Sequence, residues 1–185
     1  MEGRDSRTPG WLKAIAAGDQ GALREMYRAY AGRIYTFAFG SLRNQEESHE
    51  VVVDTMYQVW RHAARFRGDS KPSTWILGIA RNVMLTKLRS RRPDHEELPE
   101  DIAEDSPGPE APTQDRQVRD AVRACMDGLP VEQRECLHLI YFEELSVSEV
   151  AEIQGCPENT VKTRLFHARR KIKPCLAEFL RREER

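Results

Sequence analysis

Residues 145–165 read LSVSEVAEIQGCPENTVKTRL, and this stretch decides the fold of the second half of the chain. Ser146 or Ser148 can cap a short helix, because a serine oxygen accepts a hydrogen bond from the first helical turn. Gly155 then stands at the position of a tight turn, and Val161 follows where the next helix must face inward. This spacing predicts two short helices joined as a helix-turn-helix.

The second helix of this motif is expected from about residue 157 to 173, after a helix over residues 131–142. Pro157 suits its first turn, where the missing N–H has no helical partner. The helix has six cations and one acid, Glu158, so it fits a major groove, with early residues at base edges and later cations at the phosphate backbone. The alternative is a helical hairpin whose basic surface binds nothing. The cations are Lys162, Arg164, Arg169, Arg170, Lys171 and Lys173.

Residues 93–115 form an acidic segment with nine acids, five prolines and no Lys or Arg. Its few apolar groups cannot offset the entropy lost on ordering, and its prolines forbid a continuous helix. The sequence therefore predicts an all-α protein of two small helical domains, residues 1–92 and 116–185, joined by a flexible acidic linker.

Apolar residues recur at helical spacing three times in the first domain. The pattern predicts helices over residues 22–39 and 46–66, and a third helix that Ser73 or Thr74 can cap. Between the second and the third helix, Gly68 and Pro72 interrupt the periodicity. The first domain should therefore contain an irregular loop between two helices.

Basic residues cluster around this loop, although the formal net charge of the chain is only −1. Residues 60–92 contain nine Lys or Arg against one acid, Asp69. Cations interleaved with aromatic rings suit single-stranded nucleic acid, because the cations neutralise the phosphates and the rings stack on the bases. The alternative is that the cations form a solvated face and that Trp60 and Trp75 are core residues.

Targeting and cysteine patterns narrow the class of protein. The N-terminus has no apolar run of signal-peptide length and no later segment approaches membrane-spanning length, so we expect a cytoplasmic protein with no membrane insertion of its own. An adhesion role for the RGDS tetrapeptide at residues 67–70 would require secretion. No CxxC pair occurs, which favours reduced, mostly buried thiols over a disulfide framework or zinc site and leaves a redox or metal sensor open. The cysteines are Cys125, Cys136, Cys156 and Cys175.

Taken together, the two motifs resemble the extracytoplasmic-function (ECF) sigma factors, compact initiation subunits of bacterial RNA polymerase. The resemblance extends from about residue 14 to residue 176. In the first half the matching stretches are AGDQGALREMYRAYAGRIY, VDTMYQVWRHAARFRG and STWILGIARNVMLTKLRSRR. In the second half they are LPVEQRECLHLIYFEELSVSEVAEI and NTVKTRLFHARRKIK.

The resemblance implies three sets of contact residues. The set for the melted minus-ten element is Arg67, Asp69, Ser70, Lys71, Thr74, Trp75, Arg81 and Asn82. The set for the minus-thirty-five element is Asn159, Thr160, Lys162, Thr163, Arg164, Phe166, His167 and Arg170. The set for docking on the polymerase is Val52, Val53, Asp54, Met56, Tyr57 and Trp60.

The resemblance also implies the partners. They are the β′ clamp and β flap of core RNA polymerase, promoter DNA and an anti-sigma factor, with the free chain a monomer. No cofactor or metal is expected, and no residue of this chain is catalytic. His167 stands where an arginine is common in the family, which removes a bidentate guanine reader, so the promoter sequence is not transferable from relatives.

Two other classes of function are compatible with parts of the sequence. A dimeric regulator that binds duplex operators would use the helix-turn-helix, but this class of function does not explain the basic loop. A helical hydrolase or metal site would use His49, Glu50, Asp54 and His138, whose spacing matches no HExxH pattern.

Overall fold

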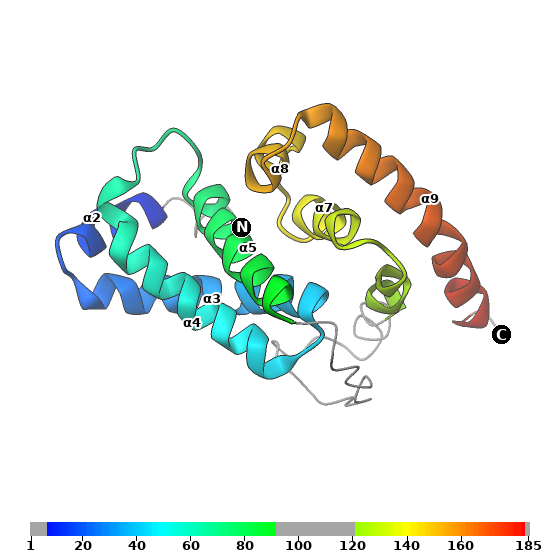
Figure 1. Cartoon of the computed structure of the whole chain (residues 1–185), viewed down its shortest axis with the longest axis horizontal. Helices are drawn as coiled ribbons and strands as arrows, with labels where there is room; N and C mark the ends of the chain where they lie inside the picture. The colour runs from blue at the N-terminus through cyan, green and yellow to red at the C-terminus, as the bar shows by residue number, and fades with distance from the viewer. Residues whose placement is uncertain (1–6, 92–120, 184–185) are drawn as a thin grey trace.

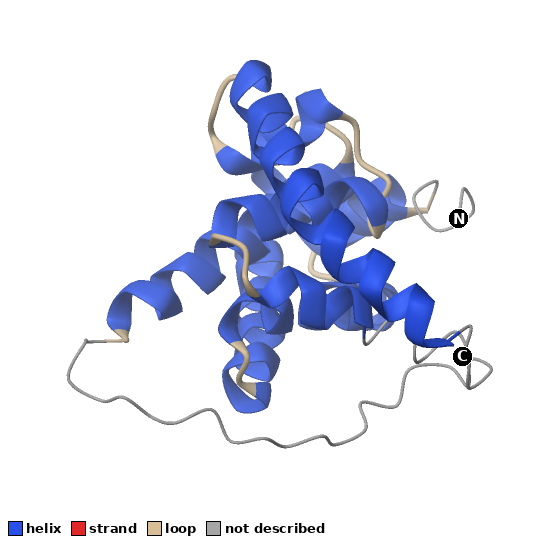
Figure 2. Cartoon of the chain, turned by 90° about the vertical axis from the view of Figure 1, so that its right-hand side faces the viewer, coloured by secondary structure: helices blue, strands red, loops and turns tan. Residues whose placement is uncertain are grey.

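The computed structural model describes residues 7–91 and 121–183, and every regular element within them is helical (Figure 2). The all-α class is therefore confirmed, while the predicted linker lies outside the described residues. None of the described helices is long and apolar enough to cross a membrane. The first part contains α2 (Thr8–Ala16), α3 (Gln20–Leu42), α4 (Gln45–His62), the short 3₁₀ helix η1 (Ala63–Arg65) and α5 (Pro72–Ser90). The second contains a helical stretch at 121–127, then α7 (Val131–Tyr141), α8 (Val147–Gln154) and α9 (Glu158–Glu183).

Local capping explains how α3 and α4 are separated. The Asp19 carboxylate accepts hydrogen bonds from two N–H groups at the start of α3, at 2.7 and 3.2 Å. At the other end of α3, Arg43 adopts a left-handed conformation with φ 53°. Asn44 then caps α4 by accepting a hydrogen bond from the Glu47 N–H at 2.9 Å. These contacts end one helix and begin the next within two residues.

The start of α5 differs from the prediction. The helix begins at Pro72, its N-cap is Lys71, and no side chain caps it. Ser73 and Thr74 therefore lie inside the first turn, not at the cap position, and each is only 1% exposed. A proline in the first turn loses no helical hydrogen bond, which allows the helix to begin before either expected cap.

The helix-turn-helix is confirmed. The Ser146 hydroxyl accepts a hydrogen bond from the Glu149 N–H, while the Glu149 carboxylate accepts one from the Ser146 N–H, which makes a capping box. Gly155 ends α8 with φ 61°, a conformation that favours glycine. The second helix of the motif, α9, is longer than predicted and continues through Pro174 to Glu183.

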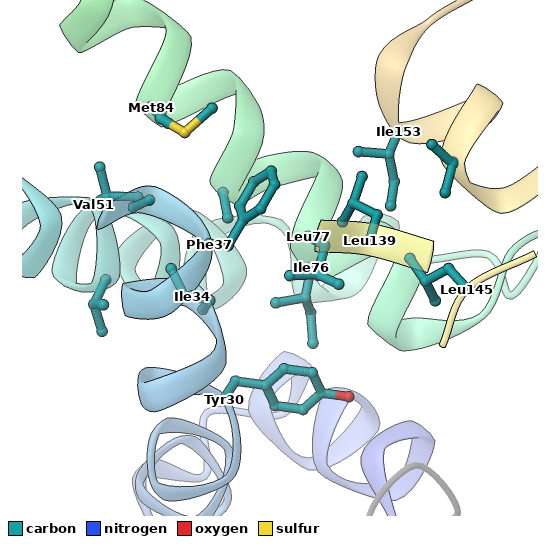
Figure 3. Packing of buried hydrophobic residues seen from close by; sticks show 14 of the residues in the cluster. Tyr30, Ile34, Phe37, Val51, Ile76, Leu77, Met84, Leu139, Leu145 and Ile153 are labelled. Atoms are coloured by element: carbon teal, nitrogen blue, oxygen red, sulfur yellow. The ribbon is translucent and has the colours of Figure 1, made fainter. Parts of the chain in front are cut away.

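The helices form two groups, α2–α5 and α7–α9, with α5 facing the second group (Figure 1). The buried apolar residues of both groups belong to one cluster, in which α5 contacts α8 and α3 contacts α7. Figure 3 shows Leu77 of α5 and Leu139 of α7 within this cluster, and both are fully buried. Phe37 of α3 lies against the ring of His138 of α7, with centroids 5.4 Å apart. The two sequence-defined halves therefore share an apolar interface.

The cysteines correct the prediction of four reduced thiols. Cys125 and Cys175 form a disulfide, with Cα atoms 5.7 Å apart and a separation of 50 positions in sequence. The spacing could not reveal this pair, because the contact exists only when the far end of α9 lies beside residues 121–127. The other two, Cys136 and Cys156, are free. Burial raises the pKa of the Cys136 thiol to about 11, so that thiol stays protonated at neutral pH.

Candidate nucleic-acid interface

The helix α9 presents a polar face beside an apolar one. Val161, Leu165 and Ala168 point into the core and are at most 4% exposed. Between them, most residues expected to contact the minus-thirty-five element point to solvent, as the helical period requires. Those exposed are Asn159, Lys162, Thr163, Phe166, His167 and Arg170, while Thr160 is half-buried.

Arg164 lies differently from the other cations of α9. Its Nη1 donates to Oε1 of Gln154 at 2.8 Å and lies 3.5 Å from Sγ of Cys156. The guanidinium therefore connects α9 to α8 and to the turn between them. In this position Arg164 supports the helix-turn-helix and has fewer donors left for DNA.

The loop between η1 and α5 contains the RGDS tetrapeptide. Gly68 has φ 79°, which explains why glycine suits this position. Arg67 Nε lies 3.3 Å from Asp69 Oδ2, and both side chains are at least 79% exposed, so this ion pair contributes little to stability. The rings of Phe66 and Trp75 pack at 5.3 Å between centroids across the two ends of the loop. The loop is thus held at its base and exposed at its tip.

Three residues expected at the minus-ten element contact the second group of helices. Lys71 Nζ lies 3.0 Å from Glu149 Oε1, and the Thr74 hydroxyl donates to the same oxygen at 3.3 Å. Arg81 Nε donates to Oε2 of Glu135 at 2.8 Å. Of the others in the set, Asn82 is exposed and Ser70 half-buried. The structure therefore divides this set into a free loop and a covered helix face.

The face of α4 expected to dock on the polymerase is narrower than predicted. Val53 is 59% and Tyr57 55% exposed, and Asp54 is exposed as well. Val52 and Met56 lie in the core at 2% and 5% exposure, so a partner cannot contact them without disturbing it. Each of them precedes its exposed neighbour, Val53 or Tyr57, by one residue, which turns the side chain by about 100° around the helix and into the core. Trp60 is half-buried and completes the exposed strip.

Acids of α4 pair with cations at the end of α5. Lys87 contacts Glu50 and lies 3.7 Å from Asp54, and Arg91 contacts Glu47. The hydrogen bond to Glu50 is the main cause that raises the pKa of Lys87. Part of the basic block seen in the sequence is thus neutralised within the first group of helices.

The residues of the suggested hydrolase or metal site do not form a cluster. His49, Glu50 and Asp54 lie on α4, where Glu50 and Asp54 pair with Lys87 and the ring of His49 lies 4.6 Å from that of Tyr35. His138 is buried on α7 against Phe37. In the part of the chain that the structure describes, no group of three or more His, Cys, Asp or Glu side chains is arranged to hold a metal ion.

Sequence reasoning missed the acids of the second group that contact the first. Glu135 is 1% exposed and Glu143 is 7% exposed, and Glu143 forms an ion pair with Arg33 of α3 at 2.6 Å. Glu149 of α8 also contacts the first group. Its spacing from Ser146 fits a capping box, but that pattern concerns only the start of α8 and does not indicate the contact. No pattern in the chain indicates a contact between residues more than 50 positions apart.

Comparison with known proteins gives two family matches, one to each group of helices. Residues 26–93 match Sigma-70 region 2, and residues 119–172 match Sigma-70, region 4. The chain is 30% identical over 166 residues to the ECF RNA polymerase sigma factor SigM of Mycobacterium tuberculosis, covering 87% of this chain and 80% of SigM. It is 25% identical over 178 residues to the ECF RNA polymerase sigma factor SigW of Bacillus subtilis, covering 90% of this chain and 95% of SigW.

A solved structure shares the fold. The sigma factor RpoE of Bartonella quintana, solved in complex with the anti-sigma factor NepR, matches with a TM-score of 0.67, at 22% identity over 83% of this chain and 96% of that chain. The sequence matches cover both helical groups in the order expected for the family. The chain therefore belongs to the ECF RNA polymerase sigma factors, the transcription-initiation proteins that associate with RNA polymerase.

Proposed function

We propose that this sigma factor directs core RNA polymerase to promoters by reading two elements. The loop at residues 66–72 and the adjoining part of α5 read the melted minus-ten strand. The exposed face of α9 reads the duplex minus-thirty-five element. The phosphodiester chemistry belongs to the polymerase, and no residue of this chain acts as a catalyst.

The observation that carries this proposal is the two-faced recognition helix. Its inward residues, among them Val161 and Leu165, are buried in the core, and the turn at Gly155 joins α9 to α8. The outward side chains therefore have a fixed orientation. Lys162 is 59% and Phe166 62% exposed, which leaves a cation and an apolar ring free for phosphates and thymine methyl groups. A helix-turn-helix that presents its second helix in this way fits the major groove.

The minus-ten assignment is supported by the form of the loop. Its tip is exposed, its base is closed by the Phe66 and Trp75 rings, and basic side chains flank it. Removing a base from the stack costs a few kcal/mol, which nearby cations and an aromatic platform offset. In this proposal Arg67, Asp69 and Ser70 shape the receiving loop, and Asn82 lies beside the strand.

The docking proposal is restricted to the exposed residues of α4. We assign contact with the β′ clamp to Val53, Asp54, Tyr57 and Trp60, and contact with the β flap to the second group of helices. Control by an anti-sigma factor is part of the same proposal. It is supported by the fold shared with RpoE of Bartonella quintana, which was solved with its anti-sigma factor NepR.

Reconstituted transcription tests the proposal. The purified chain is added to core polymerase on genomic fragments, and new start sites are mapped. We expect promoter-specific initiation that Lys162→Ala weakens at the duplex-binding step, whereas Trp75→Ala or Asn82→Ala impairs opening more than initial binding. Core polymerase that gains no new start site would refute the proposal. A dimeric footprint on palindromic duplex DNA without polymerase would instead favour the operator-binding regulator.

A further inference from the structure

A small hollow lies between α3 and the second group of helices, and its lining shares no residue with the three sets expected to contact DNA or the polymerase. Its enclosed volume is about 30 Å³, enough for about two water-sized groups. Side chains of Phe39, Met126 and Phe142 make part of the lining apolar. Phe142 is 40% exposed and the Arg43 side chain is 35% exposed, so the hollow opens to solvent beside them.

Three guanidinium groups meet at this hollow from three segments of the chain. Arg43 follows the last residue of α3, Arg123 lies in the helical stretch at 121–127, and Arg134 lies on α7. Burial lowers the pKa of Arg43, and the charges of Arg134 and Arg123 lower it further, so the like charges act on one another. Gathering like charges in a partly buried place costs free energy that a bound anion offsets.

The contacts of Arg134 hold its guanidinium in place without neutralising it. Its Nη1 donates to the Gly40 carbonyl oxygen at 2.6 Å, and its Nη2 donates to the Leu129 carbonyl oxygen at 2.9 Å. Carbonyl groups orient a cation but carry no formal charge. The Nε of Arg134 is buried and makes no hydrogen bond within the described part of the chain, so this donor remains for a ligand.

The lining offers no negative charge of its own. Among the described residues that line the hollow, none is acidic. Arg43 forms an ion pair with Asp127, which lies outside the lining and has a side chain that is 53% exposed. A pair as exposed as this one contributes little to stability, so an anion of higher charge can displace the aspartate.

We propose that this hollow binds a phosphate group, held by the guanidinium groups of Arg43, Arg123 and Arg134. The planar fork of a guanidinium matches the spacing of phosphate oxygens, and parallel N–H···O bonds to an anion are strong. The enclosed volume accepts phosphate oxygens, and any group esterified to the phosphate would leave on the open side, beside Phe142. The site does not depend on the promoter-reading proposal.

Two sources can supply such a group, namely free inorganic phosphate and the 5′-phosphate of a mononucleotide. The arginines would bind the same oxygens in both. A nucleotide would also place a base or sugar against the exposed edge of Phe142, which adds stacking or apolar contact. Parallel titrations with inorganic phosphate and with AMP therefore distinguish the two.

Isothermal titration calorimetry of the full chain tests the site, in chloride buffer of constant ionic strength. Arg43→Gln and Arg123→Gln each remove one guanidinium from the hollow. Arg28→Gln is the matched control, because Arg28 lies on α3, pairs locally with Glu25 and has a side chain that is 67% exposed. All three variants change the net charge by the same amount.

We expect one phosphate to bind per chain. Loss of a charged hydrogen-bond donor should weaken this binding about tenfold in Arg43→Gln and in Arg123→Gln, while Arg28→Gln leaves it nearly unchanged. Asp127→Asn removes the competing carboxylate and should strengthen binding, a gain that misfolding cannot produce. Glu25→Gln makes the same charge change at an exposed position of α3 and should have almost no effect.

The order of the two affinities identifies the source. Tighter binding of AMP assigns the site to a phosphate ester, and tighter binding of inorganic phosphate assigns it to the free ion. Absence of saturable binding for both ligands would overturn the proposal. Equal effects of Arg28→Gln and Arg43→Gln would do the same, because they would show only the general attraction of an anion to the charge of the chain.

Discussion

Arg81 of α5 and Glu135 of α7 form a buried ion pair across the two groups of helices, with Nε and Oε2 at 2.8 Å. The two residues are 54 positions apart in sequence. One oxygen of Glu135 accepts from both Arg81 and Gln154, and the other oxygen, Oε1, is buried without a hydrogen-bond partner. The carboxylate therefore depends on Arg81 for most of its electrostatic compensation.

Removing Arg81 should lower the free energy of unfolding of the chain. Arg81→Ala leaves the Glu135 carboxylate buried beside Gln154 alone, and breaking a buried pair from one side costs about 3–5 kcal/mol. Chemical denaturation of the free chain measures the loss. Arg89→Ala, at an exposed position of the same helix, is the control and should change the free energy of unfolding by less than about 0.5 kcal/mol. Equal losses for the two variants would contradict the role of this pair.

Acid should separate the two groups of helices, because Glu143 and Glu149 join them through contacts that need ionised carboxylates. Burial raises the pKa of Glu143, but His138 and the Arg33 guanidinium lower it more, so the pKa lies below its ordinary value of 4.5. Burial likewise raises the pKa of Glu149, but hydrogen bonds from Ser146 and Lys71 lower it more, so this pKa also lies below its ordinary value. A depressed pKa contributes stability above the unfolded value and loses it as the pH falls through the folded value.

The expected result is a compact chain at neutral pH that expands as the pH falls below about 4.5. Scattering measures the expansion, and far-UV circular dichroism checks that the helices remain. A double variant, Glu143→Gln with Glu149→Gln, should be less compact at neutral pH and show a smaller further change in acid. A transition of the same size in the double variant would assign the acid response to other groups.

Two neighbouring cations of α9 should respond differently to truncation. Lys162 is exposed and makes only a long local contact with Glu158, at 3.7 Å, whereas Arg164 is bonded to Gln154. Lys162→Ala should weaken duplex binding by the holoenzyme and reduce its salt slope by about 1, with stability unchanged. Arg164→Ala should cost about 1–3 kcal/mol of stability, because it leaves a buried amide oxygen without its charged donor. Binding titrations at several salt concentrations and thermal unfolding distinguish the two.

The Cys125–Cys175 disulfide should stabilise the second group of helices. It closes a loop of 50 residues, for which chain entropy gives about 4 kcal/mol. Cys125→Ser and Cys175→Ser should each lower the free energy of unfolding by a similar amount, and reductant should have the same effect on the unmodified chain. The double variant should lose no more than either single one. Additive losses would mean that the two residues act separately.

The predictions from the sequence succeeded where a signal was local. The cap by Ser146, the glycine turn and the inward position of Val161 all appear in the structure, since each depends on residues within one or two turns. The expected cap of α5 by Ser73 or Thr74 was wrong, although that signal is also local. The Thr74 hydroxyl instead donates a hydrogen bond to Glu149 of α8, a residue far away in sequence.

The sequence by itself determined the helical class, the helix-turn-helix and the exposed face of α9, because helical periodicity and turn chemistry are written in neighbouring residues. Only the tertiary structure decided which cations of the basic block are free and which are covered. Arg81 and Lys71 look alike in sequence to the exposed Arg67, yet each pairs with an acid of the second group. Such pairs form between segments far apart in the chain, and their energy depends on burial that no local pattern records.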